Sequence, residues 1–496
     1  MTGRLSLSAL AGLPAAVRRP AYDVAAAQVG VVHLGVGAFH RAHQAVYLDD
    51  ILGRGHAGWA VAGASLRSPA TSDALDPQDG LYTLAVRSGA GEELRVIGAL
   101  RRRLVAPREP EALLATMADP RVRIVTLTVT EKGYCHDPAT GTLDEAHPDI
   151  RADLADPGRP CSAPGYLVEA LARRRAAGIA PFTVLCCDNL PANGRTVARV
   201  VARLAALRDG DLGRFVAGEV AFPSTMVDRI VPATTDADRA QVAQALGCDD
   251  AWPVAAEPFS QWVVEDHFPL GRPPLEEVGV ELVADVAPFE HMKLRLLNGA
   301  HSTMAYLGYL AGHAHISDVM AQPAFARLVE RLQDEELTPT LHLPPGVDVA
   351  AYKSALRERF RNPALQHRTW QIAMDGSQKL PQRLVAPARE RLAAGAPIAL
   401  IAFAIAGWMR YVAGRDEAGG AIDVRDPLAA RLKALADEAG PDAARLAPAL
   451  LGVREVFGAD LPADPRFAGA VTAALDLILR EGAAAAVART AQAPAA

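Results

Sequence analysis

The stretch Val31-Val32-His33-Leu34-Gly35-Val36-Gly37-Ala38-Phe39-His40 joins a short apolar run to a turn with two glycines, and it is the main indication of the fold. The apolar run is typical of a buried strand, and residues 38–52 predict a helix. A strand, a glycine turn and a helix in this order form the context of a dinucleotide fingerprint. The first glycine permits the tight turn, and the second lets a pyrophosphate approach the helix N-terminus. We therefore predict that residues 35–40 bind a dinucleotide cofactor.

The sequence departs from that fingerprint at two places. His40 stands where a third glycine is usual, so we expect the helix and the strand to pack differently. The second strand, residues 59–66, leads into Arg67 and Ser68 without the acidic residue that binds the ribose 2′-hydroxyl of NAD. Arg67 is therefore a cofactor-binding candidate that suits a 2′-phosphate, and both NAD and NADP stay open.

Two further strand signals predict a doubly wound parallel sheet in the first half of the chain. Ile124–Val129 and Phe182–Cys187 are apolar runs separated by helix-like segments. Polar residues follow each run, namely Thr130-Glu131-Lys132-Gly133 and Asp188-Asn189. Because ligands of open α/β sheets bind beyond the carboxyl ends of the strands, these polar residues are site candidates.

The second half of the chain has a different composition: it is rich in Ala, Leu and Arg at helical spacing. We predict an α/β Rossmann-type N-terminal domain over residues 1–287 and a mostly α-helical C-terminal substrate and catalytic domain over 288–496. Residues 392–409 carry no charge and could span a bilayer, but Pro397 interrupts them, so a buried helix is expected. From Gly482 onward we expect a frayed helix or a disordered tail.

The net charge and the cysteine pattern argue against several classes of binding partner. The net charge of −6 argues against a nucleic-acid partner, and the clusters Arg101–Arg103 and Arg173–Arg175 are expected on solvated faces. The five cysteines show no zinc-ligand spacing, and His40 and His43 lack a third ligand, so we expect no metal. Reduced thiols and the absence of a signal pattern predict a cytoplasmic protein without a membrane partner; its oligomeric state stays open.

The run Lys293-Leu-Arg-Leu-Leu-Asn298-Gly-Ala-His301 gathers polar groups on one helix. At α-helical spacing Asn298 lies about 140° and His301 about 80° from Lys293, so all three fit one broad face, with Glu290 near it. A lysine whose pKa is lowered can accept the proton of an alcohol during metal-free oxidation. An amide can stabilise the alkoxide, a histidine can orient the substrate, and Glu290 can pass the proton to solvent. An amphipathic helix with an ordinary polar face is the alternative.

Four stretches together resemble the mannitol dehydrogenase family, the polyol-specific long-chain dehydrogenases. They are Gly35–His43, Thr128–Tyr134, Cys187–Leu190 and Lys293–His301. The resemblance covers nearly the whole chain and implies a Rossmann-type domain, a helical domain and a zinc-free, mostly NAD-dependent active site.

The same resemblance implies a role for each matching residue. Lys293 would be the general base, and Asn189 and Asn298 would stabilise the alkoxide. His301 would orient the substrate, and Glu290 would relay the proton. Asp228, within Met226–Pro232, would contact substrate hydroxyls, and Glu131 would contact the cofactor.

Within the family, two stretches resemble the fructuronate-reducing members, which are mannonate oxidoreductases: Glu131–Cys135 and His367–Pro381. Mannitol-specific members have a glycine where Lys132 stands and an arginine near the position of Gln371. A mannonate carboxylate needs a cation, and Lys132, Arg368 and Lys379 are the candidates, with surface ion pairing as the alternative.

Three readings of the function remain open. The chain is expected to be a metal-independent D-mannonate/D-fructuronate oxidoreductase, or else a mannitol 2-dehydrogenase or another polyol dehydrogenase. A non-catalytic nucleotide-binding or redox-sensing protein is the alternative of a different class. Lys293 with Asn298 and His301 argues against it, because a sensor needs no base with hydrogen-bond donors.

Overall fold

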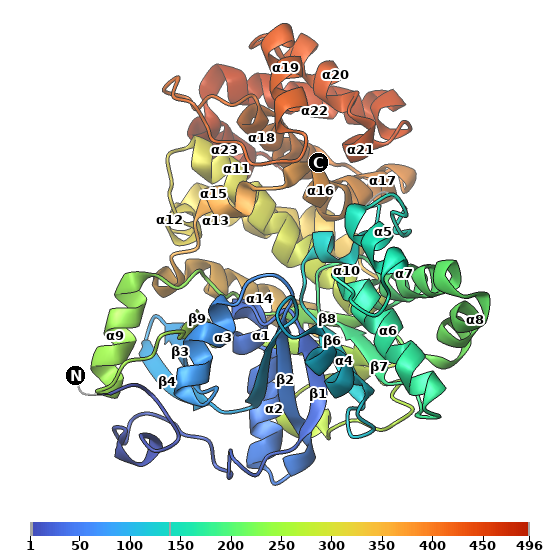
Figure 1. The fold of residues 1–496 in the computed structure, drawn as a ribbon. Helices are drawn as coiled ribbons and strands as arrows, with labels where there is room; N and C mark the ends of the chain where they lie inside the picture. The colour runs from blue at the N-terminus through green and yellow to red at the C-terminus, as the bar shows by residue number, and fades with distance from the viewer. Residues whose placement is uncertain (1–2, 138–139, 495–496) are drawn as a thin grey trace. The chain divides into compact units, whose positions relative to one another are not determined.

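The computed structural model describes residues 3–137 and 140–494, and the chain divides into two compact units, Met1–Ala287 and Pro288–Ala496. The first unit holds the β-sheets together with helices, and the second is built of helices (Figure 1). The predicted combination of an α/β Rossmann-type domain with a mostly α-helical domain is confirmed.

The central sheet of the first unit has five parallel strands in the order β5-β2-β1-β6-β7. Their bounds are β1 Val29–Leu34, β2 Ala60–Ser65, β5 Leu100–Val105, β6 Ile124–Leu127 and β7 Thr183–Cys186. The chain builds outward from β1 to β5 on one side and then returns to add β6 and β7 on the other. The order thus reverses between β1 and β6, which is the topological switch point where such sheets bind ligands.

Both faces of this sheet are covered, because side chains alternate along each strand. Val32 and Leu34 of β1 pack on one face, whereas Val31 packs on the other. Helices α4 (Pro110–Ala118), α6 (Ala163–Ala176) and α7 (Asn193–Arg208) cover the first face, and α2 (Gln44–Gly53) contributes to the second (Figure 1). The sheet is therefore doubly wound.

Two three-stranded sheets complete the first unit, in the orders β11-β10-β8 and β4-β3-β9. Their strands are β3 Tyr82–Ser88, β4 Gly91–Ile97, β8 Thr225–Asp228, β9 Val254–Ala256, β10 Gln261–Glu265 and β11 Glu281–Val283. The remaining helices that begin in the first unit are α1 Ala38–Ala42, α3 Ala70–Leu75, α5 Pro148–Ala155, α8 Gly210–Glu219, α9 Asp236–Leu246 and α10 Ala287–Met292, of which α10 continues into the second unit.

The second unit is organised around two buried helices, α11 (Ala300–Leu310) and α18 (Ala399–Val412). Around them lie α12 Ile316–Met320, α13 Pro323–Arg331, α14 Val349–Arg361, α15 Thr369–Ala373, α16 Gly376–Leu380, α17 Ala386–Ala393, α19 Ala429–Ala439, α20 Ala443–Leu451, α21 Arg454–Phe457, α22 Pro465–Glu481 and α23 Ala483–Gln492. The uncharged stretch forms α18, the buried helix that was expected. Within the described residues, we find no helix with the length and apolar character needed to cross a bilayer.

The single helix predicted over residues 38–52 is wrong. Helix α1 ends at Ala42, and α2 begins at Gln44, because His43 has φ −129° and ψ −89°. The Nε2 atom of His43 donates to the carbonyl oxygen of Gln261 at 2.8 Å, and the ring packs on Phe39 and Trp262. A tertiary contact thus overrides local helix propensity.

Of the two alternatives expected from Gly482 onward, a frayed helix or a disordered tail, the disordered tail is wrong, because residues 483–492 form α23. Ala486 and Val487 are buried. Arg327 and Arg331 of α13 donate to the carbonyl oxygens of Ala491 and Thr490, each at 2.9 Å. The C-terminal helix is therefore docked at its last carbonyl groups.

Arg174 corrects a third expectation, that the cluster Arg173–Arg175 is solvated. Its side chain is only 1% exposed. The guanidinium donates to the carbonyl oxygens of Ala180 at 2.7 Å and Val122 at 2.9 Å, and to two others. It thereby donates to carbonyl groups at the C-terminal end of α4 and in the segments that follow α4 and α6.

Candidate active site

The glycine turn after β1 is closed in a way that only glycine permits at its first position. Gly35 has φ +96°, and a Cβ atom there would lie 2.1 Å from the carbonyl oxygen of Thr128. Its own N–H donates to the carbonyl oxygen of Ala64 at 2.8 Å, and the Thr128 hydroxyl donates to the Gly35 carbonyl oxygen at 2.8 Å. The turn is therefore clamped between β2 and the segment that follows β6.

Gly37 differs, because nothing in the protein forbids a side chain there. Its φ is −89°, and a Cβ atom would meet its nearest neighbour, the Gly35 carbonyl oxygen, at 3.9 Å. Packing within the protein therefore does not require glycine at position 37. The close approach of a ligand to the backbone would require it. Val36, Ala38 and Phe39 complete this predicted cofactor-binding turn.

His40 replaces the third glycine of the fingerprint through a flat stack of two rings. The His40 ring lies 3.4 Å from the His33 ring of β1, with 14° between their planes. Both rings are fully buried, and burial lowers the pKa of each, that of His33 to about 3. Neutral imidazoles therefore bring helix and strand together, and the side chain of His40, a predicted cofactor-binding residue, is fully buried.

His33 also ties the turn to the neighbouring strand. Its Nδ1 atom lies 2.7 Å from the Thr126 hydroxyl, and its Nε2 atom lies 3.1 Å from the Gly35 carbonyl oxygen. Nothing in the sequence singles out this residue, because a histidine inside an apolar strand is typical of a core position.

The half-buried carboxylate of Asp188 organises the carboxyl ends of β6 and β7. Asp188 accepts hydrogen bonds from the Val129 N–H at 2.8 Å, the Thr130 N–H at 3.1 Å and the Tyr134 hydroxyl at 2.7 Å. Burial raises its pKa to about 6, although these hydrogen bonds oppose the shift. Thr130 is held at φ +64°, which is strained for a β-branched residue and is typical of functional sites.

The predicted candidates on these loops lie at the ligand-binding edge. Glu131 and Lys132 begin the short turn Glu131–Tyr134 after β6, and both are exposed. Asn189 follows β7 and is also exposed. Because β6 lies between β1 and β7, these loops belong to the same edge as the glycine turn.

Two other candidates of the first unit have contrasting environments. The Arg67 side chain is 82% exposed, and its guanidinium lies 3.9 Å from the Asp149 carboxylate. Asp228 ends β8 and is only 3% exposed. Asn193 links this region to β7, because its amide donates to the carbonyl oxygens of Asp188 and Thr225.

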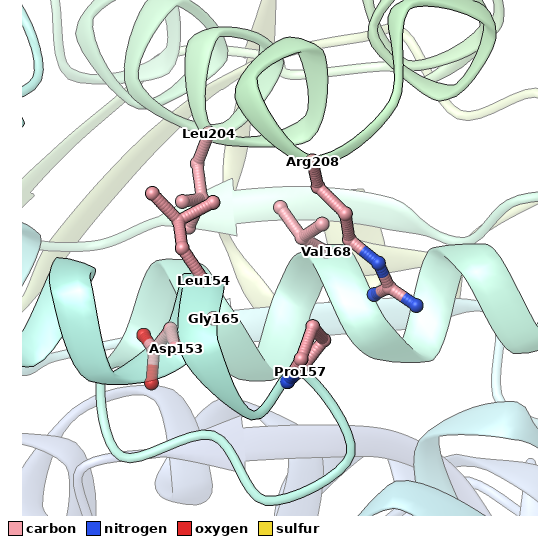
Figure 2. Close-up of a pocket in the computed structure, with 7 residues that line it drawn as sticks. All are labelled: Asp153, Leu154, Pro157, Gly165, Val168, Leu204 and Arg208. Carbon is pink, nitrogen blue, oxygen red and sulfur yellow. The ribbon is translucent and has the colours of Figure 1, made fainter.

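A small pocket of the first unit is lined by Asp153 and Arg208 with apolar side chains between them, and lies among α5, α6 and α7 (Figure 2). Its volume of about 10 Å³ admits no more than a water molecule. It is therefore not a substrate site.

In the second unit, Lys293–Gly299 form a π-helical segment that continues into α11. The α-helical spacing predicted for this run is therefore wrong. The wider turns of i→i+5 hydrogen bonding place Asn298 closer in angle to Lys293 than about 140°. Lys293 and His301 are 7% and 5% exposed, whereas Asn298 and Glu290 are partly exposed.

His301 is a neutral imidazole whose Nε2 atom makes no hydrogen bond to the described residues. Burial lowers its pKa well below 6.5, and the charges of His367 and Arg359 lower it further. Its Nε2 atom is buried and has no hydrogen-bond partner among the described residues. The ring packs on Phe360 at 4.6 Å and on His367 at 5.3 Å. Such a nitrogen can orient a substrate hydroxyl, the role implied for His301.

Three cations act on His301: Arg359, Arg383 and Lys379 each lower its pKa. Arg383 donates to the Ser302 hydroxyl at 3.0 Å, and Lys379 donates to the Met374 carbonyl oxygen at 2.6 Å. Sequence reasoning identified Lys379 but missed both arginines, which come from α14 and from the π-helical segment Pro381–Val385.

Arg368 is not buried with this group. Its side chain is exposed at the start of α15, and its neighbour His367 packs against His301 instead. The stretch His367–Pro381 therefore contains a residue of this site, but the residue that contacts His301 is His367 and not the predicted Arg368.

Known proteins share this architecture. The model of the mannitol dehydrogenase Rossmann domain matches residues 29–277, and that of the mannitol dehydrogenase C-terminal domain matches residues 285–479. The chain belongs to the mannitol dehydrogenase family. The family resemblance inferred from the four sequence stretches is thereby confirmed.

Relatives within the mannitol dehydrogenase family are similar over their full length. D-mannonate oxidoreductase of Escherichia coli is 47% identical over 94% of this chain and 96% of that protein. Mannitol 2-dehydrogenase of Pyricularia oryzae is 41% identical over 97% and 98%. The structure of Pseudomonas fluorescens mannitol 2-dehydrogenase, a ternary complex with NAD and D-mannitol, superposes with a TM-score of 0.91 at 38% identity over 99% and 100%.

Proposed function

We propose that this oxidoreductase interconverts D-mannonate and D-fructuronate with NAD as its cofactor. The observation that carries the proposal is the group of cations around the neutral His301, namely Lys379, Arg359 and Arg383. A sugar acid brings a carboxylate that such a group can meet, whereas mannitol and fructose bring none. Similarity to the E. coli D-mannonate oxidoreductase supports the same substrate class.

The glycine turn fits a nicotinamide dinucleotide. Gly35 shapes it, Gly37 leaves room for the pyrophosphate, and the N-terminus of α1 faces the switch point. When bound, the nicotinamide would supply the hydride acceptor for oxidation of the alcohol carbon and the hydride donor for reduction of the ketone. NAD is favoured over NADP because the Asp149 carboxylate, 3.9 Å from Arg67, would repel a 2′-phosphate there.

The chain's own residues handle the proton. Lys293 takes the hydroxyl proton during oxidation and returns it during reduction, and Glu290 exchanges that proton with solvent. The amides of Asn189 and Asn298 donate to the developing alkoxide, where one donor contributes about 3 kcal/mol. The neutral His301 holds a substrate hydroxyl through Nε2, and Asp228 accepts hydrogen bonds from others.

The carboxylate assignment is tested at Lys379. Replacing it with Met removes one charged hydrogen bond, worth about 1.5–3 kcal/mol, so KM for fructuronate should rise about 10- to 100-fold. Lys379→Arg should restore much of the affinity because the charge is kept. Lys353→Met is the matched control, since Lys353 pairs with Asp334 at 2.6 Å.

Thermal unfolding of each variant shows whether the fold is kept, because Lys379 also donates to the carbonyl oxygens of Ile372 and Met374. An unchanged KM for fructuronate in a folded Lys379→Met protein would exclude this cation from carboxylate binding. A mannitol-type activity would then become the better explanation of the fold.

A further inference from the structure

Three side chains of the first unit come together although their sequence spacing gave no hint of it. Cys135, His147 and Asp149 each offer one ligand atom, and these atoms all lie within 4.8 Å of one another. We propose that these three residues bind a zinc ion. The proposal revises the expectation that the chain holds no metal. None of the three residues takes part in the proposed proton transfer, although Asp149 also supports the preference for NAD.

The local fold brings the ligands to one place. Cys135 ends the turn after β6 at φ +51°, and its carbonyl oxygen accepts from the Asp144 N–H at 2.9 Å, which folds the chain back. His147 precedes α5, and its Nδ1 atom accepts the Asp149 N–H at 3.2 Å, a long hydrogen bond that the imidazole would give up to offer this lone pair to zinc. The thiol is buried, whereas His147 and Asp149 are partly exposed, so the ion has an entry path from solvent.

The chemistry of the donors favours zinc. A thiolate, an imidazole and a carboxylate form a set that suits zinc, whereas calcium and magnesium prefer oxygen ligands throughout. Zinc bonds of about 2.0–2.3 Å place tetrahedral ligands about 3.3–3.8 Å apart, so closing the site needs side-chain movements of about 1 Å. Burial and then the carboxylates of Asp149 and Asp153 raise the pKa of the Cys135 thiol to about 12, and a dication would offset this negative field.

A water molecule would be the fourth ligand of a tetrahedral ion, because His147 and Asp149 are partly exposed to solvent. The exposed Cys161 thiol donates to the carbonyl oxygen of Asp149 at 3.6 Å and is not one of the three proposed ligands.

The metal would stabilise the loop that carries two cofactor-edge candidates. Tyr134, directly before Cys135, donates to Asp188, and Glu131 and Lys132 begin the same short turn. Zinc at Cys135 would fix the C-terminal end of this turn to the start of α5. The ion would thus act on loop order, not on the chemistry of the proton.

The test measures zinc and cobalt in the full-length protein. We expect about one zinc per chain by elemental analysis after purification without chelators. Cobalt added to the chelator-treated protein should give the visible bands of a tetrahedral ion and a sulfur-to-cobalt charge-transfer band. Cys135→Ser should abolish the charge-transfer band, and His147→Asn should weaken metal binding while keeping a helix-capping oxygen.

Cys248→Ser is the matched control, because it removes a buried thiol outside the cluster. The proposal is overturned if the folded protein binds neither ion stoichiometrically. It is equally overturned if both ligand variants retain the metal and the charge-transfer band as the control does. Because His147→Asn keeps the cap, its result stands even if Cys135→Ser fails to fold.

Discussion

Gly35→Ala is the perturbation whose effect follows most directly from the structure. The new Cβ atom would lie 2.1 Å from the carbonyl oxygen of Thr128 and 2.7 Å from its carbonyl carbon, and both are backbone atoms. The residue would also have to keep φ +96°, where side chains other than glycine's are strained. The turn must therefore open or the loop after β6 must move.

The expected cost comes from these two effects. Holding an L residue in such a backbone conformation costs about 1–3 kcal/mol. Forcing a methyl group into a packed site costs about another 1–3 kcal/mol. The free energy of unfolding of the first unit should therefore fall by about 2–6 kcal/mol, a large share of a typical domain's stability of about 5–15 kcal/mol.

Gly37→Ala is the matched control, because φ −89° and a nearest contact at 3.9 Å accommodate a methyl group. Denaturant unfolding should show near-parental stability for Gly37→Ala and a clear loss for Gly35→Ala. Titration with NADH should show a loss of affinity for Gly37→Ala. A methyl group against the pyrophosphate lowers the binding free energy by about 1–3 kcal/mol, which raises Kd about 5- to 150-fold. Parental stability of Gly35→Ala, or parental NADH affinity of Gly37→Ala, would refute the account of this turn.

Three further predictions concern the proton, pH and a buried cation. Lys293→Ala should lower turnover by about 10²–10⁴-fold while NADH affinity stays parental in a fluorescence titration; unchanged turnover would remove the assigned base. Burial lowers the pKa of His33 from 6.5 to about 3, so stability present above pH 6.5 is lost toward pH 3 at about 1.4 kcal/mol per pH unit. Unfolding at several pH values should show a shallower loss for His33→Asn but not for the exposed control His267→Asn. Arg174→Met, which removes one donor from four carbonyl groups, should cost about 2–4 kcal/mol in denaturant unfolding, whereas exposed Arg175→Met should cost less than about 0.5 kcal/mol; equal effects would contradict the role of Arg174.

The strands of the central sheet could be predicted because local composition decides them. Ile124–Val129 and Phe182–Cys187 were predicted, and β6 and β7 occupy Ile124–Leu127 and Thr183–Cys186. β-Branched and apolar runs bounded by polar residues leave little alternative to a buried strand. The glycine turn could be predicted for a similar reason. Its backbone at Gly35 has φ +96°, a conformation that favours glycine, and the sequence has glycine there.

Other features depend on contacts between distant residues and could not be predicted. The break at His43 follows from its hydrogen bond to Gln261, which lies far away in the chain. The π-helical turn at Lys293–Gly299 has the side-chain pattern of an ordinary helix, so the sequence alone predicts the wrong angles. Arg359 and Arg383 look like any surface arginines until tertiary packing brings their charges to His301.

The most direct test of the proposed function follows nicotinamide absorbance with purified protein and offers fructuronate, tagaturonate and fructose in parallel, each with NADH and with NADPH. We expect NADH to be oxidised with fructuronate and not with fructose, because only the sugar acid brings a carboxylate that the cations acting on His301 can attract. Oxidation of NADH with fructose but with neither keto-uronate would contradict that claim and make the protein a mannitol-type dehydrogenase.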